Sequence, residues 1–453
     1  MHSADRKSTL PRAWWLLAAT LSSCALVAPV SASASADPVP AYAPGEVVVG
    51  HDDGKVEVVE LAKSETFAET VTELERDPSV RFAERNWIAR TALAPLDVGT
   101  SGLPGGWQVD QWSFLDRTGG IRINGAWDRA IAAAAPGGAG VTVAVVDTGL
   151  AYAPSNGYAA APDFGATQFV AGIDLVDDDA VALDENGHGT HVAATIGESV
   201  TVGQPAGDND YLTGIAYGAS LMPVRVLDRN GAGAVTDVAA GVLWAARNGA
   251  DVINLSLQFD SAVTGCDQVP TLCAAVRKAN RRGALVVAAA GNAVDGTGSR
   301  QGLFPAGAPK AFAVAATTEH GCLAAYSQFG REMDLLAPGG GIPRSAASRA
   351  ECALDQRPIL QLSYECFPGR CMGVNGEYAI RPDLGTSMAA AHTSGVAALV
   401  LATGVLGADV SPERLARRLQ CTARVGAPSR YYGNGLLDAG RATNPGIDCG
   451  RPK

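Results

Sequence analysis

The chain has 453 residues, which is enough for one large domain or for two to three domains of ordinary size. With 47% hydrophobic and only 18% charged residues, it is not a mainly disordered protein. A net charge of −11 without long basic runs argues against nucleic acid as a partner.

Residues 1–36 have the organisation of a signal peptide. Basic residues open the segment, an apolar run follows over residues 13–30, and the small residues 31–36 offer cleavage sites. Polar residues and a proline interrupt the run, and no later segment has the roughly 18–20 uninterrupted apolar residues of a membrane span. We therefore expect no membrane span and a secreted, extracellular protein.

Cys24 offers a different fate for the leader. The sequence Leu21-Ser-Ser-Cys24 resembles a bacterial lipoprotein box, in which the cysteine is lipidated and kept. The apolar run continues past Cys24, which favours ordinary cleavage. A lipid-anchored or periplasmic protein is the alternative to a secreted one.

Eight cysteines follow Cys24, and an even number of cysteines in an exported chain predicts disulfide bonds. Eight cysteines allow 105 pairings, so the sequence leaves the connectivity open. Short separations favour Cys266 with Cys273 and Cys366 with Cys371, then Cys421 with Cys449, with Cys322 and Cys352 remaining. A zinc site is the alternative, but the sequence lacks the Cys-x-x-Cys pairs and interleaved histidines that it would need.

Residues 37–94 have the pattern of a small α+β domain. Apolar stretches predict strands over 46–49, 56–59 and 79–87, and apolar residues at helical spacing predict a helix over 64–76. A unit of this size is marginally stable alone because it buries little surface.

A connector rich in proline, glycine and serine over residues 94–106 leads into a long region, 95–453, that we expect to form one α/β domain. Strands that alternate with helices predict a parallel sheet with right-handed crossovers. The expected strands are near-continuous apolar runs, as in strands buried on both faces: 141–146, 221–227, 252–257, 285–289 and 312–316.

A helix is expected from Thr236, as its N-cap, through Ala246. Residues 339–381 fit neither pattern and predict a long inserted loop.

Four polar residues stand at strand ends or helix starts, where acyl transfer to a hydroxyl could be organised. Asp147 ends the first strand of the α/β region, His188 and Ser387 each open a helix, and Asn292 follows the strand over 285–289. Such chemistry needs a nucleophile, a base, an acid that orients the base, and donors for the oxyanion. The carboxyl edge of a parallel sheet is where α/β proteins place their sites.

Each of these residues alone has a more ordinary explanation. Asp-Thr-Gly and Gly-Asn are common turns, and Gly-Thr-Ser is a common entry into a helix. His188 and His191 could be a metal pair or a satisfied helix start. The prediction of acyl transfer depends on finding all four residues together, in the order Asp, His, Asn, Ser.

The motifs around these residues resemble those of the subtilisin-type serine proteases, whose triad runs in the order Asp, His, Ser. The resemblance covers about residues 110–445 and is carried by VAVVDTGL (143–150), NGHGTHVA (186–193), VVAAAGN (286–292) and GTSMAA (385–390). It implies a subtilisin-like catalytic domain in a serine endopeptidase. It also implies that residues 37–94 are a pro-domain that acts as chaperone and transient inhibitor, with maturation between Thr91 and Thr100.

The resemblance further implies a role for each site residue. Ser387 would be the nucleophile and His188 the general base, whose protonation below neutral pH would lower activity. Asp147 would orient His188, and Asn292 would form the oxyanion hole with the Ser387 N–H. Catalysis would need no cofactor, and the enzyme would be a monomer that acts on polypeptides.

Two segments would pair with an extended substrate, and a third would form a wall of the primary pocket. The pairing segments are Gly231, Ala232, Gly233 and Ser256, Leu257, Gln258, and the wall is Ala288, Ala289, Ala290. Small walls favour a medium or large apolar side chain before the scissile bond and broad specificity. The family usually has glycine where Gln258 stands, and a side chain there can narrow the pocket. We expect the insertion 339–381 to border the leaving-group side.

Calcium bound to surface loops is usual in the family. The acidic candidates are Asp177, Asp178, Asp179 with Asp184, and Asp208, Asn209, Asp210. Solvated acidic loops explain each cluster more simply, and no ligand is assigned.

Three alternatives stay open. Apolar residues before Asp-Thr-Gly also occur in aspartic proteases, but that class needs a second aspartate and an all-β fold. A non-catalytic binding protein could use the same scaffold. The sequence does not distinguish a degradative protease from a processing enzyme.

Overall fold

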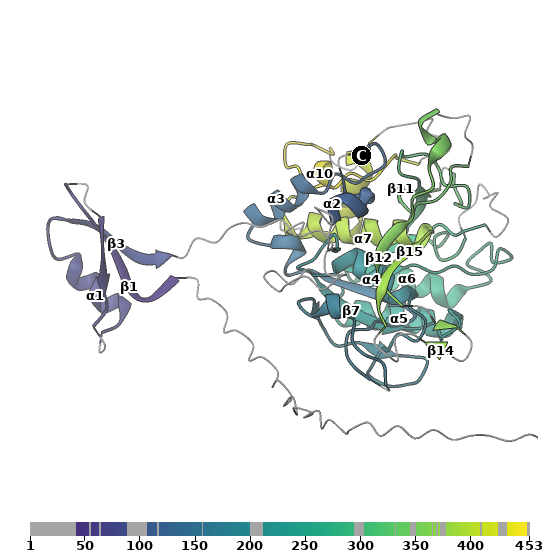
Figure 1. Ribbon diagram of the computed structural model, residues 1–453, viewed down its shortest axis with the longest axis horizontal. Helices are drawn as coiled ribbons and strands as arrows, with labels where there is room; N and C mark the ends of the chain where they lie inside the picture. The colour runs from purple at the N-terminus through teal and green to yellow at the C-terminus, as the bar shows by residue number, and fades with distance from the viewer. Residues whose placement is uncertain are drawn as a thin grey trace, which may run out of the picture. The chain divides into compact units, whose positions relative to one another are not determined.

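The computed structural model divides the chain into two units, Met1–Thr91 and Ala92–Lys453, which are described separately (Figure 1). It describes residues 42–53, 56–62, 65–87, 107–115, 117–155, 157–199, 212–293, 303–330, 332–344, 350–364, 366–367, 370–371, 377–407, 410–424 and 433–450. The leader with Cys24 and the expected maturation interval lie outside these residues. Within them, no helix has the length and apolar character needed to cross a membrane.

The N-terminal unit is a three-stranded antiparallel sheet with one helix. Its elements are β1 Tyr42–His51, β2 Val56–Glu60, α1 Phe67–Leu74 and β3 Val80–Trp87, and the strand order is β2-β1-β3. The helix begins after Thr66, because Thr66 and Glu69 form a reciprocal capping box. Val47 and Val49 on the central strand are buried. The strands and helix predicted for this segment are therefore present.

The second unit is built on an eight-stranded sheet in which every described strand pair is parallel. The order is β11-β10-β9-β8-β4-β7-β5, with β6 also paired to β7. The strands are β4 Thr142–Asp147, β5 Gln168–Phe169, β6 Ile173–Asp174, β7 Ser220–Arg225, β8 Val252–Leu255, β9 Leu285–Ala289, β10 Ala311–Thr317 and β11 Leu335–Pro338. The sheet and its alternation with helices confirm the predicted α/β fold.

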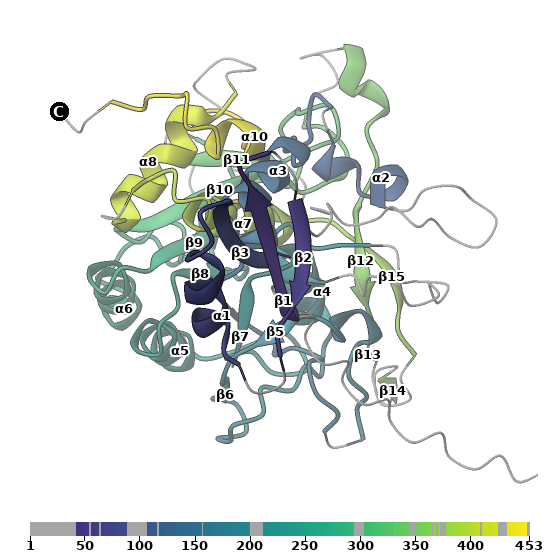
Figure 2. The same cartoon turned by 90° about the vertical axis from the view of Figure 1, so that its left-hand side faces the viewer.

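Helices cover both faces of this sheet. The described helices are α2 Trp107–Asp110, α3 Asn124–Ala132, α4 His188–Gly197, α5 Val235–Arg247, α6 Pro270–Arg281, α7 Thr386–Ala402, α8 Pro412–Thr422 and α10 Ala439–Ala442. Along β4, Val143 and Val145 join the core under α4 and α7, whereas Ala144 and Val146 join the core under α5 and α6. Figure 2 shows α5 and α6 side by side on one face. Because both faces are buried, the strands read as continuous apolar runs.

Two sequence predictions about this unit are wrong. Helix α5 has Ala234 rather than Thr236 as its N-cap, and Thr236 lies inside the first turn. The region 339–381 is not one long loop, because β12 Ile359–Ser363 pairs antiparallel with β15 Ala379–Asp383. The short strands β13 Cys366–Phe367 and β14 Arg370–Cys371 also pair within it. Its strands lack a clear two-residue alternation, since β12 buries four of its five residues.

Three disulfide bonds join described residues in the second unit. They link Cys266 to Cys273, Cys322 to Cys352 and Cys421 to Cys449. Cys366 and Cys371 face each other in the register of β13 and β14, but their side chains lie outside the described part.

Candidate active site

Asp147 and His188 meet at the carboxyl edge of the sheet. Asp147 is the last residue of β4, and its side chain is fully buried. His188 is the first residue of α4, and its Nδ1–H donates to Asp147 Oδ1 at 2.7 Å. The Thr148 N–H donates to the same oxygen at 2.8 Å. The carboxylate thereby fixes which ring nitrogen of His188 carries the proton and leaves Nε2 able to accept one.

A buried carboxylate shapes the turn that precedes His188. Asp184 Oδ1 accepts the N–H groups of Asn186 and Gly187, and Oδ2 accepts the N–H and hydroxyl of Thr190. Gly187 has φ of 106°, a left-handed conformation that favours glycine. Asp184 therefore organises the start of α4.

The inserted strand β12 supports this turn from outside. The Ser363 hydroxyl donates to the Gly187 carbonyl oxygen at 2.6 Å. A Cβ atom on Gly187 would lie 2.1 Å from the Tyr364 carbonyl oxygen, so the backbones approach too closely for any other residue. The insertion thus contacts the turn that carries His188.

Ser387 is the second residue of α7, and two hydrogen bonds tie it to the segment after β8. Its hydroxyl donates to the Ser256 carbonyl oxygen at 3.1 Å, and the Ser256 hydroxyl donates to the Ser387 carbonyl oxygen at 2.8 Å. Among the described residues no hydrogen bond joins Ser387 to His188. In this conformation the Ser387 hydroxyl is directed to Ser256 and not to His188.

Asn292 lies beside the start of α7 and is held through its side-chain oxygen. Oδ1 accepts both the N–H and the hydroxyl of Thr386 at 3.0 Å. This assignment leaves Nδ2 as a donor, and a Cβ atom on Gly385 would lie 3.4 Å from that nitrogen. The Ser387 N–H belongs to the first turn of α7, where backbone donors have no intrahelical acceptor. Two donors are thus available beside the Ser387 hydroxyl.

One cleft of about 720 Å³ brings most of the predicted site residues together. Its lining includes Asn186, His188, Gly231, Ala232, Gly233, Ser256, Leu257, Gln258, Phe259, Ala289, Asn292 and Ser387. Of the three alanines expected in the wall, Ala288 and Ala290 instead pack in the core under α5 and α6. Ala289 alone lines the cleft, because successive residues of a strand face opposite sides.

The environment of His188 favours the protonated imidazole. Burial is the largest single influence and opposes the charge, but the Asp147 carboxylate and its hydrogen bond, together with the charges of Asp383 and Asp184, raise the pKa of His188 to about 9. A raised pKa would move the expected fall in activity from below neutral pH into alkaline solution. By contrast, burial lowers the pKa of His191, whose Nε2 bonds the Arg381 carbonyl oxygen at 3.2 Å. His191 therefore has a structural partner on β15 and does not form a metal pair with His188.

The acidic loop proposed for calcium holds an arginine. The buried Arg225 guanidinium donates to Asp174 Oδ2 at 2.8 Å, and to Asp177 Oδ2 and Glu185 Oε2 at 2.6 Å each. Both oxygens of Asp184 accept the hydrogen bonds described above. Two of the four candidates, Asp177 and Asp184, are therefore engaged with donors of the protein, and no calcium ligand is assigned here. The second cluster, 208–210, lies outside the described part.

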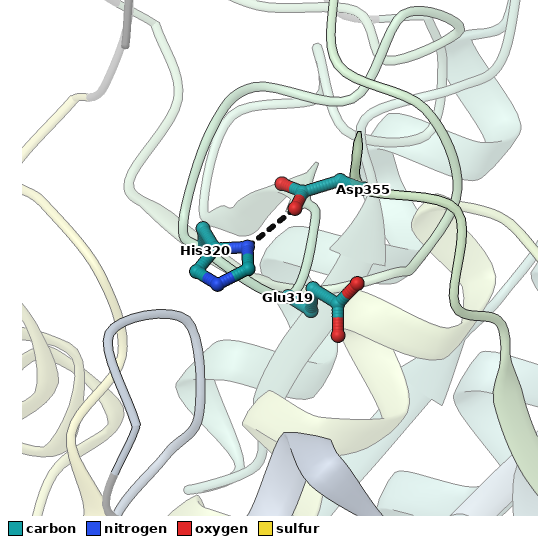
Figure 3. A group of neighbouring side chains, drawn as sticks. All are labelled: Glu319, His320 and Asp355. Carbon is teal, nitrogen blue, oxygen red and sulfur yellow. Dashed lines mark hydrogen bonds and ion pairs between the residues drawn. The ribbon is translucent and has the colours of Figure 1, made fainter. Parts of the chain in front are cut away.

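The described residues contain one other set of metal-ligand types, Glu319, His320 and Asp355 (Figure 3), whose ligand atoms lie within 4.8 Å of one another. Asp355 already accepts from the Thr318 hydroxyl at 2.5 Å and pairs with His320 Nδ1. The adjacent cavity is lined by Arg117, Arg122 and Arg424, whose positive charge disfavours a cation. We assign no metal to this set.

Several residues of the site carried no recognisable signal in the sequence. The sequence indicates Asp184 only as a possible metal ligand. The contacts of Ser363 and Tyr364 with the turn before His188 join segments 176 residues or more apart. Thr386, which holds the Asn292 side chain, lies within the GTSMAA motif. Only its position in that motif could have indicated a role in the site.

Comparison with known proteins adds to this geometry. A sequence model of the subtilase family matches residues 138–435. An extracellular protease of Xanthomonas campestris pv. campestris is 31% identical over 428 residues, which cover 85% of this chain and 62% of that protein. A thermostable alkaline protease of Halalkalibacterium halodurans is 35% identical over 308 residues, which cover 68% of each chain. This chain thus spans less than two thirds of the Xanthomonas protein.

Among solved structures, a protease from Pseudoalteromonas arctica superposes with a TM-score of 0.57 at 28% identity. The match covers 74% of this chain and 96% of that chain.

Proposed function

The chain belongs to the subtilase family of serine proteases and has its subtilisin-like α/β fold, and we propose that it is a secreted endopeptidase acting through Asp147, His188 and Ser387. The observation that carries the proposal is the hydrogen bond between Asp147 and His188, in the same cleft as the helix-start Ser387. Neither an aspartic protease nor a binding protein accounts for this arrangement, since an aspartic protease has an all-β fold and binding needs no oriented histidine.

The proposed reaction begins when the Ser387 hydroxyl turns from the Ser256 carbonyl toward His188. His188 Nε2 takes the hydroxyl proton as Ser387 Oγ forms a bond to the substrate carbonyl carbon. The negative oxygen that results is held by Asn292 Nδ2–H and the Ser387 N–H. His188 then gives its proton to the leaving amine as the C–N bond breaks, which leaves an acyl group on Ser387.

Water completes the cycle by the same steps. His188 Nε2 takes a proton from water, the oxygen adds to the acyl carbon, and Ser387 Oγ leaves with the proton that His188 returns. Asp147 stays ionised throughout and stabilises the imidazolium. No cofactor enters these steps.

The substrate is proposed to be an extended polypeptide that lies between Gly231–Gly233 and Ser256–Gln258. Both segments line the cleft that contains Ser387, and main-chain pairing with them would give broad specificity. An apolar residue is proposed before the scissile bond, because the single alanine that forms this wall, Ala289, is small and apolar.

The N-terminal unit is proposed to be a pro-domain that inhibits the enzyme until it is cut. Its separation as a compact unit of one sheet and one helix supports this role. Export through the leader 1–36 is supported by the disulfide bonds and by a relative named an extracellular protease. The exported enzyme is proposed to be a monomer. A lipid anchor at Cys24 is the alternative.

Two measurements test this proposal. Hydrolysis of casein by the secreted protein should be lost in Ser387→Ala and in His188→Ala, while far-ultraviolet circular dichroism stays unchanged. Intact mass and N-terminal sequencing should show that the wild type loses the segment up to residues 91–100 and that Ser387→Ala keeps it. Casein hydrolysis by Ser387→Ala near the wild-type rate would refute the catalytic assignment. Equal processing of both proteins would refute self-cleavage.

A further inference from the structure

The Gln258 side chain spans the cleft beside the proposed nucleophile. Its Oε1 accepts the Asn292 main-chain N–H at 2.6 Å, and its Nε2 donates to the Asn292 carbonyl oxygen at 3.4 Å. Gln258 follows β8 and Asn292 follows β9, the neighbouring strand. The two bonds therefore join the two walls of the cleft across its open, solvent-exposed side.

A substrate must place a side chain in this same space. The carbonyl carbon under attack lies against Ser387 Oγ, and its oxygen lies against Asn292 Nδ2. The side chain of that residue branches from the adjacent α-carbon, so it starts one bond away from the reacting carbonyl. The Ser387 hydroxyl is itself only 3.1 Å from the Ser256 carbonyl oxygen, which places the β8 wall directly beside the reaction.

A large side chain at this position competes with Gln258. To admit a phenyl ring, Gln258 would have to give up both bonds to Asn292 and turn toward solvent. A hydrogen atom or a methyl group needs no such movement. Displacing Gln258 would also release the main chain of Asn292, whose side chain is the proposed oxyanion donor, so a large side chain is penalised in the transition state as well.

We infer that Gln258 closes the primary specificity pocket and makes the enzyme cut after small residues, with alanine, glycine or serine before the scissile bond. The inference rests on the proposed function and replaces the medium or large apolar side chain expected before the scissile bond with a small one. The enzyme would select small residues by excluding large ones, because the Gln258 side chain occupies the space that a large substrate side chain needs.

The test compares four chromogenic peptides, Ala-Ala-Pro-Xaa p-nitroanilides with Gly, Ala, Leu or Phe as Xaa. Gln258→Gly removes the side chain, whereas Gln258→Met fills a similar volume and makes neither hydrogen bond. Lys310→Ala is the control, since Lys310 forms an exposed ion pair with Glu413 outside the cleft. The wild type should prefer the Ala to the Phe peptide by about tenfold or more in kcat/KM. Gln258→Gly should reverse this ratio in favour of the Phe peptide, whereas Gln258→Met should keep the preference for Ala.

The outcomes separate this inference from the proposed function. A wild type that cleaves the Phe peptide as well as the Ala peptide overturns the inference, and so does an unchanged ratio in Gln258→Gly. An equal loss on all four peptides in Gln258→Gly would make Gln258 a positioning residue for Asn292 and also overturns it. If no peptide is cut but a fluorophosphonate still labels Ser387, only the specificity inference fails. If Ser387 is not labelled either, the proposed function fails.

Discussion

The ionisation of His188 makes a quantitative prediction about pH. Asp147 raises the pKa of His188 to about 9, and the reaction needs His188 neutral. The neutral fraction of a group with that pKa is about one hundredth at pH 7 and about one tenth at pH 8. In the free enzyme, kcat/KM should therefore rise about tenfold per pH unit from pH 6 to 8 and level off above pH 10.

The assay is kcat/KM for one peptide anilide between pH 6 and 11, because this parameter reports ionisation in the free enzyme. Asp147→Asn is the matched perturbation. It removes the charge that favours the imidazolium, while the burial that opposes protonation stays. The midpoint should then move down from about 9, together with a large loss of rate. A wild-type midpoint near pH 6.5, or one that Asp147→Asn leaves in place, would refute the coupling between these residues.

Three further predictions concern rate and stability, with stability measured in the Ser387→Ala background to prevent self-digestion. Asn292→Ala should lower kcat by about 10²–10³ with little change in KM, and a loss below about fivefold would contradict its oxyanion role. Arg225→Met should lower the free energy of unfolding in urea by about 3–5 kcal/mol, because it leaves the buried Asp174 carboxylate without its counter-charge, and a loss under 1 kcal/mol would show that this carboxylate does not depend on Arg225. Replacing Cys266 and Cys273 by serine should cost about 2–3 kcal/mol of unfolding free energy, as expected for a loop of this length, and an unchanged urea midpoint would show that the bond adds no stability.

Much of the fold could be predicted because the apolar runs of the strands and the polar residues at the strand ends were both clear in the sequence. Strands buried on both faces produce unbroken apolar runs, and β9 spans the predicted residues 285–289. Asp147 and Asn292 could be placed at one edge of the sheet because parallel strands end there together. The pairing of β12 with β15 escaped prediction, since fifteen residues separate the two strands.

The contacts between distant segments could not be predicted. The acidic residues near Asp177 were visible in the sequence, but the Arg225 that neutralises them is 48 residues away. The sequence shows that Gln258 departs from the family. Its bonds to Asn292, however, depend on how the loops after β8 and β9 lie next to each other. The alternation that leaves only Ala289 in the cleft depends on which face of β9 meets α7.

The central claim is that Ser387 is a nucleophile activated by His188, and covalent labelling tests it most directly. The mature protein is treated with a fluorophosphonate, digested, and mapped by mass spectrometry beside the His188→Ala variant. The account predicts one adduct, on Ser387, with loss of hydrolytic activity in proportion to labelling and far slower labelling of His188→Ala. An active preparation that carries the adduct elsewhere, or that keeps full activity once Ser387 is modified, would contradict it.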